Sequence, residues 1–287
     1  MSTDPTASRN GAGQAAVQSG TMQPLQTLAA PALRRVRGIL TDIDGTLTTG
    51  GRLPARAALA LEHLHQAGLH VIPVTGRCIA WAEILVRLWP VDAIIGENGA
   101  FYSHLRDGRL LTRFLDDAPT RARNRDRIRA LGERIVREVP GSTLASDQAW
   151  HAADLAIDHA EDVTPLPPDA VSHIVRLMQD EGMTATVSSI HVNGWFGQHD
   201  KLSMSRLCAA ELLGEDLDIR RDEWLFIGDS ANDASMFAHF PLSVGVANVR
   251  EILPQLPVAP AYVTEAVGGD GFAEMAERLL AARSDSA

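Results

Sequence analysis

Cysteines and long hydrophobic runs are the features that this sequence has least of. Its only cysteines are Cys78 and Cys208, which argues against a disulfide scaffold and fits a reducing compartment. No apolar run is long enough to span a bilayer, and the first residues lack the basic, apolar and small-residue order of a secretory signal. We therefore expect a cytoplasmic protein that does not bind membranes.

An excess of basic charge is also lacking. The 287 residues include 26 Lys and Arg against 36 Asp and Glu, a formal net charge of -10. Nonspecific binding of nucleic acid depends on a basic surface, so we expect no nucleic-acid partner. An anionic substrate would need positive charge that is fixed locally. The length and the hydrophobic content of 45% suit a globular protein with one large core or two smaller ones.

The most informative segment is Ile39–Thr48, in which an apolar run ends at Asp42-Ile-Asp44-Gly-Thr. This pattern is typical of a buried strand that carries acids at its carboxyl end. Side chains two residues apart in a strand point the same way, so Asp42 and Asp44 could address one site. Two unpaired carboxylates repel each other. A divalent cation, or a division into one nucleophile and one acid, would relieve that repulsion, so the pair indicates phosphate chemistry.

The N-terminal segment differs in composition from the rest of the chain. Residues 1–33 are rich in Ser, Thr, Gly, Ala, Gln and Pro and show little apolar periodicity. We expect a disordered extension over residues 1–35 that takes no part in the fold.

From Val36 onward, predicted strands and helices alternate, and the alternation returns after Lys201. Spacing of this kind is typical of a doubly wound α/β domain with a mainly parallel sheet. We assign residues 36–102 and 193–287 to this core. In its first part, the predicted strands and helices cover residues 36–41, 54–66, 69–75, 78–88 and 93–95.

The middle of the chain breaks the alternation. A hairpin is predicted around Asp107-Gly108, and an arginine-rich helix, a second helix and a further strand follow it. We interpret residues 103–192 as an α+β cap domain inserted into the core. The arginines between Arg121 and Arg137 predict a solvated helix face or, alternatively, a cap surface that attracts phosphorylated sugars.

Four short segments lie where a predicted strand ends or a helix begins. In an open parallel sheet the carboxyl ends of the strands line one crevice, and the fold would bring these segments together there. A hydroxyl, a lysine and four acids at one edge suit phosphoryl transfer, because Mg²⁺ takes carboxylate and phosphate oxygens and the transferred group needs donors and cations around it. The segments are Asp42-x-Asp44-Gly-Thr, Thr75-Gly76-Arg77, Lys201 and Gly228-Asp229-Ser-Ala-Asn232-Asp233.

Together these motifs resemble those of the haloacid dehalogenase (HAD) superfamily of phosphohydrolases, and they occur in the family's order. The resemblance covers the α/β part from about Val36 to Leu280. The bulky insert after the second motif, with Glu97-Asn-Gly-Ala at its entry, is similar to one branch of the superfamily. That branch contains the Cof-type, sucrose-phosphate and mannosyl-3-phosphoglycerate phosphatases.

The resemblance implies a role for each motif residue. Asp42 would be the nucleophile that forms an aspartyl-phosphate, and Asp44 would be the general acid and then the general base, although the residues alone do not choose which of the two is the nucleophile. Mg²⁺ would lie on the Asp42 carboxylate, the Asp44 backbone carbonyl and Asp229. The remaining roles are Asp233 as a further ligand or an outer carboxylate, Thr75 and the Gly76 backbone as holders of phosphoryl oxygens, Asn232 as polar support, and Lys201 as the cation that positions Asp42.

Three other segments have two interpretations each. Asn98 is either a turn residue beside Gly99 or a residue that faces the site. Arg77 is interpreted as a scaffold or surface ion pair. The stretch 191–200 is expected to be a hinge between cap and core with its aromatic residues packed inside, while its polar side chains His191, Asn193 and His199 would contact the leaving group when the cap closes.

The sequence therefore predicts an Mg²⁺-dependent phosphatase that acts on a small phosphorylated metabolite, with a sugar phosphate as the expected substrate. The cap would close over the substrate, exclude water and set specificity. A phosphosugar mutase is one alternative. A noncatalytic phosphoacceptor or sugar-phosphate sensor is another, although a base at Asp44 would not favour a stable acyl phosphate. We expect a monomer or a small homo-oligomer.

Overall fold

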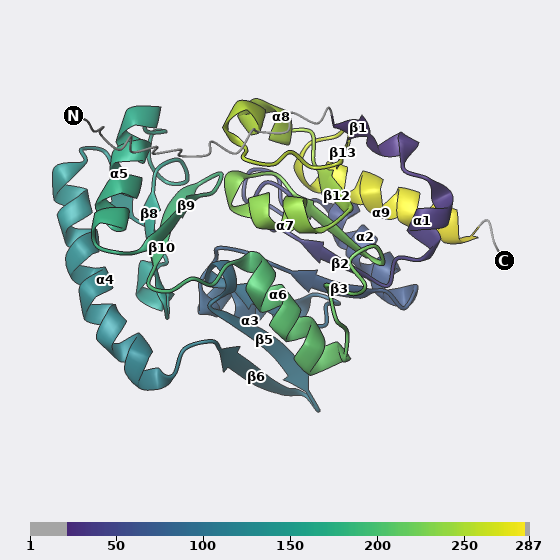
Figure 1. Cartoon of the computed structure of the whole chain (residues 1–287), viewed down its shortest axis with the longest axis horizontal. Coiled ribbons are helices and arrows are strands. Elements are labelled where there is room, and N and C mark those ends of the chain that lie inside the picture. The colour runs from purple at the N-terminus through teal and green to yellow at the C-terminus, as the bar shows by residue number, and fades with distance from the viewer. Residues whose placement is uncertain (1–21, 285–287) are drawn as a thin grey trace, which may run out of the picture.

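The structure is a computed structural model that describes residues 22–284, in which an α/β core and a cap lie side by side (Figure 1). The core consists of β1 (Gln23–Pro24), α1 (Ala30–Arg34), β2 (Gly38–Thr41), α2 (Ala55–Gln66), β3 (His70–Pro73), α3 (Ile79–Leu88), β4 (Ile94–Gly96), β5 (Phe101–Arg106), β6 (Arg109–Phe114), α6 (Lys201–Cys208), β11 (Trp224–Gly228), α7 (Ala234–His239), β12 (Leu242–Gly245), α8 (Val249–Ile252), β13 (Tyr262–Val263) and α9 (Gly268–Ser284). The cap consists of α4 (Ala118–Glu138), β7 (Thr143–Leu144), β8 (Asp154–Asp158), α5 (Pro168–Asp180), β9 (Thr184–Val187) and β10 (His191–Trp195).

A parallel sheet forms the centre of the core. Its six strands follow the order β1-β13-β12-β11-β2-β3, and every neighbouring pair in it is parallel. Parallel neighbours need long crossover connections, which helices provide here. The predicted doubly wound α/β core with a mainly parallel sheet is therefore confirmed.

Alternation along the strands explains why helices cover both faces of this sheet. Ile39 and Leu40 are neighbours in β2 and are both fully buried, but they belong to different hydrophobic clusters. Successive strand residues point to opposite faces: Ile39 packs with residues of α1, α2 and α9, and Leu40 packs with residues of α6 and α7. A strand that is covered on both sides has no polar alternation, which is why this segment is a continuous apolar run.

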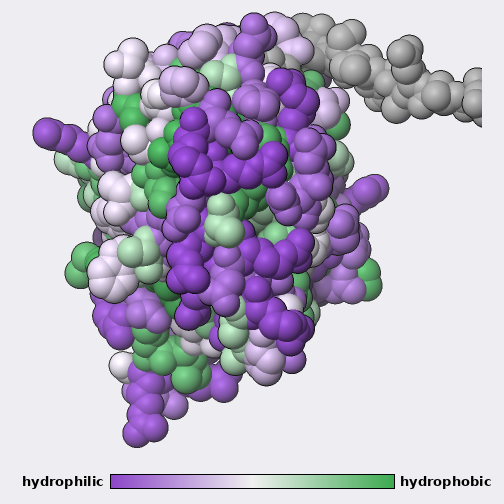
Figure 2. All heavy atoms as spheres, turned by 90° about the vertical axis from the view of Figure 1, so that its left-hand side faces the viewer, coloured by the Kyte–Doolittle hydropathy of each residue, from purple (hydrophilic) through white to green (hydrophobic). Residues whose placement is uncertain are grey.

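The cap is an antiparallel sheet in the order β7-β8-β10-β9, with α4 and α5 on one face. Leu155 and Val192 pack beneath these helices, while the alternate residues Asp154 and Asn193 are buried on the opposite face and bond to each other at 3.1 Å. Figure 2 looks onto the α4 and α5 side and shows mainly hydrophilic side chains there. Two arginines of α4 pair with acids of the cap itself, Arg129 with Asp126 and Arg134 with Glu138, which favours the solvated-face interpretation of this helix.

The N-terminal boundary differs from the sequence prediction. Residues 1–21 lie outside the described part of the chain, but residues 22–35, which we expected to lie outside the fold, belong to the core. β1 pairs with β13, and Leu25, Leu28 and Leu33 are each 1% exposed in the core cluster beneath α9. The expectation of disorder is therefore wrong for residues 22–35. Three widely spaced leucines give weak periodicity, and they are buried only because distant elements cover them.

Both predicted limits of the cap fall inside strands. Residue 103 lies in β5, which pairs with β4 and β6, and β4 continues the core sheet through a bridge between Ile95 and Val74. Residue 193 lies in β10, which pairs with β8 and β9 in the cap sheet, so the stretch interpreted as a hinge begins as a strand. The cap elements thus extend from α4 to β10. A hairpin pattern contains no information about which sheet it will join, which explains the first difference.

Because α1 packs into the core through Leu33, we predict that Leu33→Ala lowers the free energy of unfolding by about 2–5 kcal/mol, the usual loss when a buried leucine is truncated. Leu88→Ala is the matched control, because Leu88 is 71% exposed and surface changes are usually within about 0.5 kcal/mol. Urea unfolding of both variants measures the difference. Equal stability of the two variants would contradict the placement of α1 in the core.

Candidate active site

The ends of neighbouring strands bring the acidic motifs to one edge of the core sheet. β2 and β11 are parallel, with Thr41 opposite Ile227, and the backbone N–H of Asp42 donates to the Ile227 carbonyl at 2.9 Å. Asp42 and Asp229, which follow these two strands, therefore emerge side by side. Thr75 follows β3, the neighbour of β2 on its other side. The edge of the sheet thus collects the first, second and last motifs, as the sequence analysis expects.

Lys201 connects two of these acids. It is the first residue of α6, is 1% exposed, and places its Nζ 2.6 Å from Asp42 Oδ1 and 2.7 Å from Asp233 Oδ1. The other oxygen of Asp233 accepts the backbone N–H groups of Asp229 and Ser230 at 3.0 and 3.1 Å. Asp233 therefore holds both the ammonium group and the loop that carries Asp229.

Three buried carboxylates surround this single ammonium group. Oxygens of Asp42, Asp229 and Asp233 all lie within 4.8 Å of one another. Burial, which the Lys201 charge offsets only in part, raises the pKa of Asp42 to about 7. Burial and the charges of Asp42 and Asp233 raise the pKa of Asp229 well above its usual value. The site therefore carries more negative charge than its one ammonium group balances.

A hard divalent cation fits this donor set, because carboxylate oxygens are the ligands such ions take. Both oxygens of Asp233 are already engaged by Lys201 and by backbone N–H groups. Asp42 keeps one oxygen that Lys201 does not contact. Among residues 22–284, Asp229 accepts only from the neutral side chains of Thr46 and Asn248, whereas Asp233 is paired with the ammonium group of Lys201. Asp42 and Asp229 are thus the carboxylates best placed to hold a cation.

The loop after β2 approaches Asp229 so closely that only glycine fits at position 45. Gly45 has a φ of +79°, and a Cβ there would lie 2.4 Å from Asp229 Oδ2. Asn248 fastens the two loops together, because its Nδ2 donates to Asp229 Oδ2 at 2.8 Å and to the Gly45 carbonyl at 3.1 Å. The sequence analysis missed Asn248, although it follows strand β12 and the strand-end rule applies to it as well.

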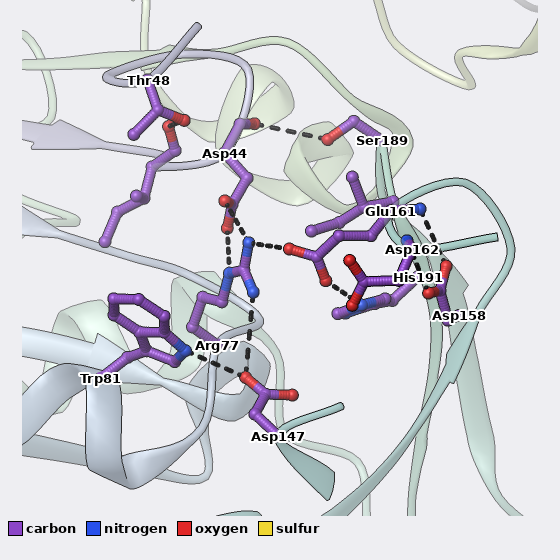
Figure 3. A network of polar contacts seen from close by, with 12 residues as sticks. Asp44, Thr48, Arg77, Trp81, Asp147, Asp158, Glu161, Asp162, Ser189 and His191 are labelled. Carbon is purple, nitrogen blue, oxygen red and sulfur yellow. Dashed lines mark hydrogen bonds and ion pairs between the residues drawn. The ribbon is translucent and has the colours of Figure 1, made fainter. Parts of the chain in front are cut away.

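Asp44 has a different cationic partner. Arg77 donates from Nε to Asp44 Oδ2 and from Nη2 to Asp44 Oδ1, both at 2.9 Å (Figure 3). The same Nη2 donates to Glu161 of the cap at 2.6 Å, and His191 Nε2 lies 2.8 Å from the other Glu161 oxygen. The contact with His191, opposed by burial and reinforced by Arg77, lowers the pKa of Glu161. Arg77 is an ion-pair residue, as predicted, but its partner is the site rather than the surface, and the sequence analysis missed Glu161.

The other predicted site residues lie around one narrow cavity. Thr75, Gly76 and Asn232 line it. Asn232 Nδ2 donates to Asn98 Oδ1 at 3.2 Å, and a Cβ at Gly76 would lie 3.1 Å from Asn98 Nδ2. Asn98 is 1% exposed and lies directly behind the cavity wall. The structure thus places these four residues in one neighbourhood with the acids.

The cap closes the cavity from the other side. Ser188, Ser189, His191 and Asn193, at the end of β9 and in β10, line it, and the Ser189 hydroxyl donates to the Asp44 carbonyl at 3.5 Å (Figure 3). The space left is about 10 Å³, roughly that of one water molecule. A substrate therefore enters only if the cap moves. His199 lies outside the cavity lining and stacks on Trp195.

Comparison with known proteins agrees with the geometry. The family model of haloacid dehalogenase-like hydrolases matches residues 39–120 and 201–274, which are the two parts of the core and the start of the insert. The chain belongs to this family of hydrolases, as its motifs predict.

Two curated relatives cover most of the chain. A phosphoglycolate phosphatase of Methanothermobacter thermautotrophicus is 28% identical over 250 residues, 85% of this chain and 99% of the relative. One of Halorubrum lacusprofundi is 32% identical over 235 residues, 79% of this chain and 92% of the relative. Together with the family these relatives confirm the predicted enzyme class, a phosphatase.

Among solved structures, the sucrose-phosphatase of Synechocystis, determined with sucrose and phosphate, superimposes with a TM-score of 0.60 at 17% identity. The match covers 86% of this chain and 98% of that one. At this level of identity, the likeness is one of fold. Within residues 22–284, no helix has the length and apolar character needed to cross a membrane.

The raised pKa of Asp42 predicts how stabilisation by a cation depends on pH. Without a cation the folded protein keeps the Asp42 proton up to about pH 7, whereas an unfolded aspartic acid loses its proton near pH 4. The folded state therefore loses stability, relative to the unfolded state, as the pH rises through this window. A bound cation favours the carboxylate and removes that loss, so its stabilising effect grows with pH.

We expect MgCl₂ to raise the unfolding temperature more at pH 7.5 than at pH 5, as measured by calorimetry. The variant Asp229→Asn should lose most of the increase at pH 7.5. An increase of the same size at both pH values would contradict this assignment.

Proposed function

We propose that this phosphatase is Mg²⁺-dependent and hydrolyses a small phosphorylated metabolite through an aspartyl-phosphate on Asp42. The observation that carries the proposal is the placement of Asp42, which is 4% exposed and bonded to Lys201 at 2.6 Å at the carboxyl end of β2. A carboxylate is a good nucleophile for phosphorus when a neighbouring cation limits repulsion from the phosphoryl oxygens. Mg²⁺ on Asp42, Asp229 and the Asp44 carbonyl would supply that additional positive charge.

The residues of the chain divide the remaining work. Lys201 orients Asp42 and favours its carboxylate form, and the charge of Mg²⁺ would add to this effect. Thr75 and the backbone of Gly76 face the cavity beside Asp42 and would hold phosphoryl oxygens. Asp44 also lines the cavity; it would give a proton to the leaving alcohol and then take one from the attacking water. Asn98 and Asn232, bonded to each other, would keep the cavity wall in place.

Two substrate classes follow from different observations. The sequence predicts a sugar phosphate, and the relatives are named phosphoglycolate phosphatases. The names of the relatives favour the smaller of these leaving groups, a two-carbon hydroxy acid. We propose a cytoplasmic enzyme that prefers short phosphorylated acids and small sugar phosphates to larger substrates.

A substrate panel tests this proposal. We expect release of inorganic phosphate in the presence of Mg²⁺, with kcat/KM higher for 2-phosphoglycolate than for a disaccharide phosphate. Removal of Mg²⁺ with EDTA should abolish turnover, and its return should restore it. Transfer of the phosphoryl group to another position of the same sugar, without release of phosphate, would favour the mutase. Phosphorylation of Asp42 without turnover would favour the sensor.

Substitution of the two acids tests their roles. We expect Asp42→Asn to abolish turnover and to prevent trapping of a phosphoenzyme, because the nucleophile is lost. Asp44→Asn should lower kcat by roughly 10²- to 10⁴-fold, the usual contribution of acid-base catalysis, and should leave Mg²⁺ affinity largely unchanged because its metal contact would be the backbone carbonyl. Calorimetric titration with Mg²⁺ measures the second effect. Equal loss of affinity in both variants would contradict the assignment.

A further inference from the structure

The cap reaches the carboxylate of the proposed acid-base residue through Arg77, a side chain of the core. Its direct contact with Asp44, from the Ser189 hydroxyl, is made with the backbone carbonyl at 3.5 Å. We propose that Glu161, held by His191, is a positioning residue that orients Arg77 and, through it, the carboxylate of Asp44 only when the cap is closed. This inference rests on the proposed function, in which Asp44 transfers protons. It explains why Asp44 would transfer protons only after the cap has closed.

Arg77 is the link between the two domains. It follows strand β3 of the core, and its guanidinium group grips Asp44 with two bonds of 2.9 Å. The nitrogen Nη2 that contacts Asp44 Oδ1 also donates to Glu161 at 2.6 Å. Movement of Glu161 therefore acts on the same nitrogen that holds Asp44 (Figure 3).

Glu161 is itself fixed within the cap. The buried Asp158, at the end of β8, accepts the backbone N–H groups of Ala160, Glu161 and Asp162 at 2.8–3.0 Å. The ring nitrogen Nε2 of His191, which is in the neighbouring strand β10, lies 2.8 Å from Glu161 Oε2. Both the backbone and the carboxylate of Glu161 thus move with the cap sheet.

The rest of the contacts of Arg77 do not replace Glu161. Trp81 lies beside the guanidinium group at 5.5 Å, and Asp147 of the cap is 3.8 Å from Nη1, which is longer than a hydrogen bond. The guanidinium group is planar and its donors have fixed directions. With Asp44 on one edge and Glu161 beside it, the guanidinium group has one orientation. Without Glu161, its only hydrogen-bonded carboxylate within residues 22–284 is that of Asp44, the group that it positions, and Asp147 stays at the longer distance of 3.8 Å.

This geometry predicts that replacement of Glu161 lowers kcat more than it changes KM. Glu161 is not among the residues that line the cavity: its Oε1 accepts from Arg77 at 2.6 Å and its Oε2 lies 2.8 Å from His191 Nε2. A small misplacement of an acid-base group costs up to roughly 10²-fold in rate, because proton transfer requires close approach. A residue that only fastened the cap, or one that bound the substrate, would instead change KM.

The variant Glu161→Gln tests this role, because it keeps the shape of the side chain and removes its charge. We expect kcat to fall by roughly 10-fold or more with a change in KM below roughly threefold. Glu161→Asp, which keeps the charge, should recover part of kcat. The matched control is Asp162→Asn, since Asp162 is the next acid in the same loop and its carboxylate makes no hydrogen bond or ion pair with any residue from 22 to 284.

A double-mutant cycle identifies the residue through which Glu161 acts. In an Asp44→Asn background, Glu161→Gln should have little further effect on kcat, because coupled residues are not additive. Full additivity of the two losses would overturn the proposal, and so would a Glu161→Gln enzyme that matches Asp162→Asn or differs from it only in KM. If Glu161→Gln does not fold, as judged by its unfolding temperature, His191→Gln is expected to show the same fall in kcat and the same cycle with Asp44→Asn.

Different results would refute the proposed function and the positioning role of Glu161. A wild-type protein that releases no phosphate from any substrate of the panel with Mg²⁺ would refute the proposed function, and the positioning role with it. An active wild type whose Glu161→Gln variant keeps full kcat would refute the positioning role alone.

Discussion

The bond between the Lys201 ammonium group and the carboxylates of Asp42 and Asp233 is the interaction on which the site depends. Removal of one partner from a buried pair of charges leaves the other uncompensated, which typically costs about 3–5 kcal/mol. Here the three groups come from the end of β2, the start of α6 and the loop after β11. The same contact therefore holds together the two parts of the core that the cap separates in sequence. It does so at the edge of the sheet where the candidate active site lies.

That arrangement also explains why the site needs more positive charge than the chain provides. One ammonium group faces three carboxylates, and burial raises the pKa of Asp42 and Asp229. The second cation of the region, Arg77, is occupied by Asp44 and Glu161. The repulsion between like charges is thus divided between two centres. Lys201, with the proposed divalent cation, offsets the charges of Asp42, Asp229 and Asp233, and Arg77 offsets those of Asp44 and Glu161.

Most of the core and of the site was predictable because it depends on local patterns. Apolar runs such as Gly38–Thr41 are buried strands with acids at their carboxyl ends, and the placement of Asp42, Thr75 and Asp229 around one edge follows from parallel pairing. The prediction for residues 22–35 was wrong for the opposite reason, because their burial depends on distant contacts. Leu25 and Leu33 are buried only because α9, about 250 residues later, covers them. The assignment of the β5–β6 hairpin to the cap was wrong for a similar reason. The sequence does not indicate whether the hairpin joins the cap sheet or pairs with β4 of the core, as it does.

The sequence by itself determined the class of enzyme, because its acidic motifs and its lysine occur in the order that is typical of the hydrolase family to which the chain belongs. Only the tertiary structure decided the partners of Asp44. Arg77 and Glu161 are 84 residues apart and occur in no shared motif, and nothing in their spacing indicates that a cap loop reaches across to a core arginine. Motifs specify which groups react because the fold positions them as a unit, whereas contacts between domains depend on how two independently folded surfaces meet.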